Sequence, residues 1–65
     1  MTDTIETIER LEKLAAWHRV RAAHAGSDRV WEARLLAAED LERRAADLRA
    51  QQRREGVHRL VQLAR

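Results

Sequence analysis

Cysteine, proline, tyrosine and phenylalanine are all absent from this chain, and glycine occurs at only two of its 65 positions. Without cysteine the protein has neither disulfides nor thiolate metal sites, and its three histidines lack the spacing of a zinc finger. With no proline and so little glycine, few positions interrupt a helix. A chain of this size buries only about 60% of its unfolded surface. Its stability must therefore come from long helices or from association.

Long hydrophobic runs are missing as well, since no uncharged apolar run approaches the ~20 residues that a membrane span needs. The segment Met1-Thr2-Asp3 carries an acid where a secretory signal carries bases. We therefore expect a cytoplasmic protein without a membrane partner. Arginine supplies all but one of the basic residues. Together with abundant alanine, this bias is typical of a GC-rich coding sequence, in a bacterium or its phage.

A first helix is expected over residues 3–25. Asp3 and Glu6 have the spacing of a capping pair at its start. His18 lies within the apolar stripe of this helix, and no histidine or carboxylate stands three or four residues from it. A hydrogen-bonded histidine at the edge of the core is therefore favoured over a pH switch or a ligand. The stripe consists of Ile8, Leu11, Leu14, Ala15, Ala22 and Ala25.

The clear break in the helical pattern lies at residues 26–27. Gly26 tolerates the left-handed conformation that ends many helices, and Ser27 or Asp28 can cap the next helix. A second helix is expected over residues 28–55. So short a turn predicts an all-α fold, an antiparallel helical hairpin that forms one domain over residues 1–65. The stripe of the second helix consists of Val30, Ala37, Ala38, Leu41, Ala45 and Leu48.

The second helix is too long for the first to cover. At 1.5 Å per residue, the first helix spans roughly 34 Å and reaches the second only to about Ala50. A new apolar stripe follows, rotated by about 150° if the helix is continuous, and Gly56 lies where the direction changes. Either the chain breaks there, and residues 57–65 form a separate short C-terminal helical extension, or the helix continues and another subunit buries its end. The new stripe consists of Val57, Leu60, Val61 and Ala64.

Further apolar residues lie off both hairpin stripes, near the turn. They suggest a second apolar face, and contiguous faces of this kind usually mark interaction surfaces. Two-fold pairing of hairpins into a four-helix bundle, or a larger helical oligomer, would cover them. The alternative is that the two tryptophans cover one end of a monomer. The expected oligomer or partner interface consists of Trp17, Val20, Trp31, Leu35, Val57, Leu60 and Val61.

The residues needed for catalysis are scarce. Ser27 is the only serine and is the expected helix cap, and no glycine-rich loop exists to hold phosphate. Glu55 and His58 have a spacing used by carboxylate metal sites in helical bundles, but glycine between them weakens that geometry. We therefore expect a protein that is not an enzyme and that has no metal site and no cofactor.

Charge is polarised along the chain. Residues 1–12 hold four acids and one base, residues 13–42 hold five of each, and residues 43–65 hold two acids and seven bases. In an antiparallel hairpin the acidic start lies near the basic end. The favoured interpretation is that the arginines balance Asp3, Glu6 and Glu9, within the fold or between subunits.

Two functions follow as hypotheses. The first is a homo-oligomeric helical module for protein interaction, acting as a small adaptor, assembly factor or regulator, whose partners are copies of itself and a further protein. The second is a nucleic-acid-binding regulator that uses the Arg-rich segment 43–65, which we do not favour because no aromatic residue there can stack on bases. Its candidate contacts are Arg43, Arg44, Arg49, Arg53, Arg54 and Arg59.

Overall fold

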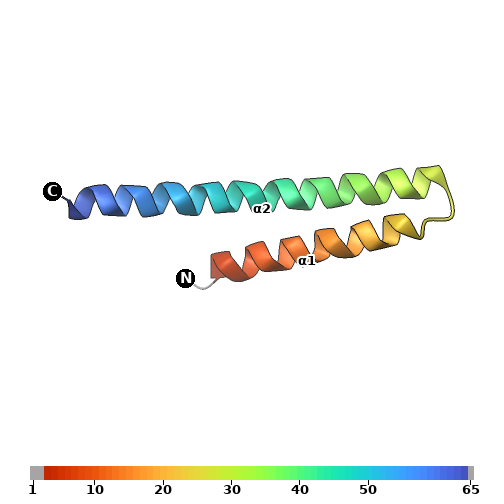
Figure 1. The fold of residues 1–65 in the computed structure, drawn as a ribbon, viewed down its shortest axis with the longest axis horizontal. Helices are drawn as coiled ribbons and strands as arrows, with labels where there is room; N and C mark the ends of the chain where they lie inside the picture. The colour runs from red at the N-terminus through yellow and green to blue at the C-terminus, as the bar shows by residue number, and fades with distance from the viewer. Residues whose placement is uncertain (1–2, 65) are drawn as a thin grey trace.

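The computed structural model describes residues 3–64 and consists of two antiparallel helices joined by a short turn (Figure 1). Helix α1 spans Asp3–Ala23 and helix α2 spans Asp28–Leu63. Together they form a rod with Cα extents of 58 × 17 × 11 Å. The start of α1 lies beside the middle of α2, whose C-terminal part continues alone (Figure 1). The predicted all-α helical hairpin is confirmed. Within the described residues, neither helix is long and apolar enough to cross a membrane.

The turn begins two residues earlier than expected. The backbone N–H groups of His24 and Ala25 donate to the carbonyls of Arg21 and Ala22, at 3.2 and 3.1 Å, which tightens the last turn of α1. The ring nitrogen Nδ1 of His24 donates to the Val20 carbonyl at 2.9 Å. These bonds give donors to three of the last carbonyl groups of α1, so the helix can end without a left-handed residue. Gly26 does not adopt the left-handed conformation that glycine tolerates, since no described residue has a positive φ.

Ser27 caps α2 as the sequence predicts. Its backbone is extended, with φ −153° and ψ 157°, and its Oγ accepts a hydrogen bond from the Val30 N–H at 3.3 Å. Asp28 adds a negative charge to the first turn, where the helix dipole favours it. The Asp3 side chain, expected to cap α1, lies outside the part of the chain that the structure describes.

The two helices meet along a seam with seven-residue spacing. Its fully covered residues are Ile8, Ala15 and Ala22 on α1, and Ala38 and Ala45 on α2. Half-buried residues lie three or four positions away, which gives the repeat of a coiled coil. Small alanines at the contact let the two backbones approach closely. The half-buried set includes Leu11, His18, Arg34, Leu41 and Leu48.

The seam is narrower than the apolar stripes of the sequence. Leu14 and Val30, which the stripes include, are 43% and 47% exposed. A coiled-coil seam occupies only two positions in seven. Ala15 and Trp31 have the spacing of the seam, so Leu14 and Val30, one residue before each of them, lie on its flank.

Helix α2 continues through Gly56 without interruption. Of the two alternatives left open by the sequence, the structure therefore has the continuous helix, and the expected short C-terminal segment is its last part. One glycine costs a helix only about 1 kcal/mol, which strong helix formers on either side offset. The last half-buried residue is Gln52, and every residue in 53–64 is exposed. We call residues 53–64 the overhang.

Candidate interaction surfaces

Most large apolar side chains of this protein lie outside the seam. Among those that the structure describes, Ile8 alone is fully covered, and four of the five buried core residues are alanines. Eleven large apolar side chains are exposed, from 43% for Leu14 to 78% for Leu63. Apolar area gathered in this way on a small protein usually marks an interaction surface. Eight of the eleven lie near the turn or on the overhang: Trp17, Val20, Val30, Trp31, Val57, Leu60, Val61 and Leu63.

Trp17 is the centre of a side-chain cluster on one flank of the seam. Its ring meets that of His18 edge to face, with centroids 4.9 Å apart and planes at 79°. The guanidinium carbons of Arg21 and Arg34 lie 5.1 and 5.2 Å from the Trp17 ring centre. Arg34 also donates to Nδ1 of His18 at 3.2 Å. His18 is thus a hydrogen-bonded residue at the edge of the core, as predicted. The cluster fixes the orientation of Trp17 yet leaves it 45% exposed.

The structure separates the four residues expected to form one face near the turn. Trp17 and Val20 lie on α1, away from the seam. Trp31 has seam spacing with Ala38 and Ala45, and it lines a shallow hollow with residues of the turn. Leu35 is half-buried and shares the heptad position of Glu42 and Arg49, on the flank opposite Leu14. Trp17 and Val20 therefore remain together, while Trp31 lies apart from them at the turn end of the seam and is 49% exposed.

The opposite flank of the seam carries two ion pairs between the helices. Arg19 donates twice to Glu42, from Nε at 2.8 Å and from Nη2 at 2.7 Å. Seven residues away along each helix, Nη2 of Arg49 donates to both oxygens of Glu12, at 2.8 and 2.9 Å. The hydrogen bond from Arg19 holds the pKa of the Glu42 carboxyl below its ordinary value of 4.5 and raises that of Arg19. Such flanking charges set the antiparallel orientation and register of paired helices.

These ion pairs were not foreseen, although a signal for them exists. Glu12 and Arg19 are seven residues apart on α1, and so are Glu42 and Arg49 on α2. Both pairs of positions lie beside the seam. Because the helices are antiparallel, the glutamate of each helix lies opposite the arginine of the other. An ion pair between the acidic start and the basic end of the chain is present at Arg49. Its partner is Glu12, which was not among the expected acids.

The six candidate arginines do not form one basic face. Arg43 and Arg44 both pair with Asp40, at 3.5 and 2.9 Å, and Arg49 pairs with Glu12. The remaining three make no ion pair within residues 3–64 and lie on the overhang. At about 100° per residue they point in three directions around the helix. The three are Arg53, Arg54 and Arg59.

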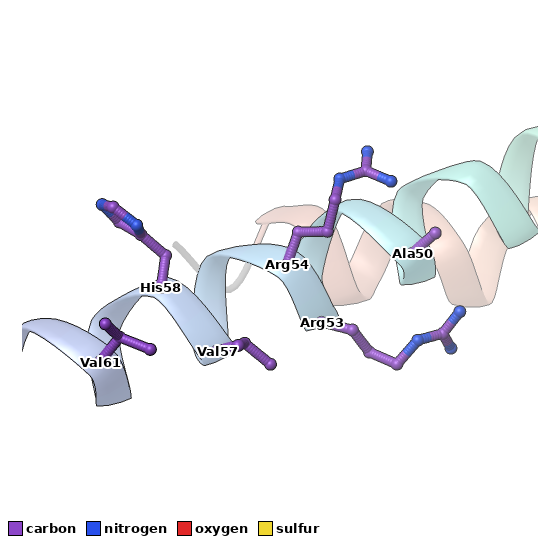
Figure 2. A pocket seen from close by; sticks show the side chains of 6 residues that line it. All are labelled: Ala50, Arg53, Arg54, Val57, His58 and Val61. Carbon is purple, nitrogen blue, oxygen red and sulfur yellow. The ribbon is translucent and has the colours of Figure 1, made fainter.

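The overhang carries a shallow hollow on one side of α2 (Figure 2). Figure 2 shows Arg53 and Arg54 extending to opposite sides of the helix, with Val57 and Val61 following them along the chain. His58 stands on the same side as Arg54, and its Nε2 accepts a hydrogen bond from Nε2 of Gln62 at 3.1 Å. All residues of the hollow come from a single helix, so it is an open surface with no opposite wall.

The described part of the chain holds no group of three or more His, Cys, Asp or Glu that could bind a metal ion. Comparison of the chain with protein-family models, with curated proteins and with solved structures found no match. The geometry of the exposed surfaces is therefore the basis for a functional interpretation.

Proposed function

We propose that this protein is a non-enzymatic helical interaction module that assembles with copies of itself and acts as a small adaptor, assembly factor or regulator. One observation carries the proposal. The hairpin fully covers a single large apolar side chain and leaves eleven exposed in the described residues. A chain with so much helix and so little core has its apolar surface available for other helices.

The energetics of the seam support this proposal. Full burial of a Val, Leu or Ile side chain contributes about 1.5–3 kcal/mol, and an alanine has far less area to bury. Four of the five fully covered residues are alanines, so the seam supplies little hydrophobic free energy. Covering the exposed residues of the overhang, such as Val57 and Leu60, would add apolar burial that the monomer lacks.

Two surfaces are suited to assembly. Side-by-side pairing of hairpins into a four-helix bundle would cover the flank around Trp17, where a fixed tryptophan lies beside Arg21 and Arg34. Tryptophan and arginine are enriched among the residues that dominate binding at protein interfaces. Pairing through the overhang would instead cover Val57 and its apolar neighbours. The second surface leaves the Trp17 flank free for a different protein, as an adaptor requires.

Mass in solution tests self-association. At micromolar concentration, light scattering is expected to give a mass at least twice the 7.6 kDa of one chain. Scattering is preferable to calibrated gel filtration because a rod 58 Å long elutes early even as a monomer. A monomeric mass together with a cooperative thermal transition would refute the proposal.

A second proposal, nucleic-acid binding through the basic segment, is favoured by the three overhang arginines that have no ion pair within the described residues. If these contact phosphates, changing Arg53, Arg54 and Arg59 to Gln weakens binding to all sequences and flattens its salt dependence by about one unit per lost contact. The matched control is Arg43→Gln with Arg44→Gln, because both of these arginines already pair with Asp40.

We expect the parent chain to show no micromolar affinity for RNA or DNA at about 0.15 M salt, because the overhang arginines diverge and no aromatic residue lies among them. Titration of labelled oligonucleotides with parent and variants measures this. Tight binding that the triple change abolishes and the control change spares would rank nucleic-acid binding first.

A further inference from the structure

We propose that the overhang pairs in antiparallel orientation with the overhang of a second copy, about a two-fold axis that passes beside Val57. The inference rests on the proposed self-association and assigns it to one surface. It differs from a side-by-side four-helix bundle because the two hairpins then extend in opposite directions and leave the Trp17 flank uncovered.

The residue pattern of the overhang is suited to pairing with itself in reverse. Ala50, Val57 and Ala64 are spaced seven residues apart and share one position around the helix. If the second copy runs in the opposite direction with its Val57 opposite Val57 of the first, Ala50 of each copy lies opposite Ala64 of the other. Two alanines then meet at each end of the contact, and the two valines meet at its centre. A self-complementary surface of this kind forms a closed two-fold dimer without leaving a second free copy of the surface.

The arginines of the overhang favour the antiparallel direction. Reversal about Val57 places Arg53 and Arg54 of one copy level with Val61 and Leu60 of the other. Their aliphatic stems can then cover these apolar side chains while the guanidinium groups stay in water. Figure 2 shows the two arginines extending to either side of the helix, which leaves the line from Ala50 to Val57 accessible. A parallel pair would instead bring four arginines together and repel.

The length of the overhang suits the same arrangement. The overhang spans roughly 18 Å. With the axis at Val57, residues 53–61 of the two copies cover one another, and residues 62–64 of each copy lie level with residues 50–52 of the other. The end of one α2 then lies level with Ala50 of the other. Arg59 lies about 200° around the helix from Val57, so its side chain stays on the side of α2 that faces away from the second copy.

Single-cysteine variants test the position of the axis, since the natural chain has no cysteine. Val57→Cys is expected to form a disulfide-linked dimer under mild oxidation, because its two copies meet at the axis. Leu36→Cys is the matched control. It shares the heptad position of Val57 and is 59% exposed against 60%, but it lies on the part of α2 beside α1. Crosslinking of Val57→Cys at least tenfold faster than the control is the expected result.

A second pair of variants tests the direction. Two Ala50 residues lie about 21 Å apart in the antiparallel dimer, too far for a disulfide, whereas Ala50 of one copy lies next to Ala64 of the other. Ala50→Cys alone is therefore expected to remain reduced, and its mixture with Ala64→Cys is expected to give the mixed dimer. Efficient crosslinking of Ala50→Cys alone would overturn the antiparallel arrangement.

Failure of this inference is distinguishable from failure of the proposed function. An oligomeric mass for the parent chain with equal crosslinking of Val57→Cys and Leu36→Cys overturns the overhang pairing and leaves self-association standing. A monomeric mass at the concentration used for crosslinking overturns both.

Discussion

Replacing Ile8 with alanine is expected to lower the free energy of unfolding by about 2–5 kcal/mol, the range for removing a buried aliphatic side chain and leaving a cavity. Ile8 is 3% exposed and is the large apolar side chain that the hairpin covers completely. Helix α2 cannot move in to fill the space without losing the ion pairs that flank the seam. Thermal or urea unfolding followed by circular dichroism, at one fixed protein concentration, measures the change.

Ile5→Ala is the matched control for this variant. It removes the same atoms from the same helix, but Ile5 is 53% exposed. Its effect on the free energy of unfolding is expected to stay within about 0.5 kcal/mol, as for most exposed positions. Equal destabilisation by the two changes would show that α1 packs on α2 through a different face.

Replacing Ala38 with leucine is expected to destabilise the hairpin by about 1–3 kcal/mol, although leucine is the more hydrophobic residue. Ala38 is 0% exposed and lies in the middle of the seam. A larger side chain at this position forces the two helix axes apart and loosens the contacts of Ala15 and Ala45. The same unfolding measurement reports the loss.

Ala46→Leu serves as the control for overpacking. Ala46 lies one residue beyond the buried Ala45 and is exposed, and leucine is nearly as good a helix former as alanine. Its unfolding transition is expected to match that of the parent. Should Ala38→Leu instead raise stability, the seam would contain space for a larger side chain, and close approach of the helices through alanine would be wrong.

The helices themselves follow from local chemistry and could be predicted from the sequence. The absence of proline, the abundance of alanine, leucine and arginine, and the cap at Ser27 all act within a few residues of where they stand. Helix rise is constant, so the prediction that α1 reaches only to about Ala50 needs no knowledge of packing. The exposed stretch at the C-terminal end of α2 begins just after Gln52, in agreement with it.

The state of each glycine could not be predicted, because two local tendencies compete there. Gly56 permits a break, but its neighbours favour helix, and no packed partner on the overhang imposes a bend. Gly26 permits a left-handed turn, yet the carbonyls of Arg21 and Ala22 already have donors from His24 and Ala25. In both cases the free-energy difference between the alternatives is small and depends on surrounding hydrogen bonds.

By itself, the sequence determined two helices, their antiparallel connection and the uncovered end of α2, since each depends on interactions between residues near one another in the chain. Only the tertiary structure decided which residues form the seam. That choice depends on the rotation and axial shift of one helix against the other, which small side chains such as Ala15 and Ala38 permit and the pairing of Arg19 with Glu42 favours. The same rotation leaves Leu14 on the flank, because one narrow seam cannot hold every apolar residue of both stripes. It also places the guanidinium group of Arg34 over the Trp17 ring.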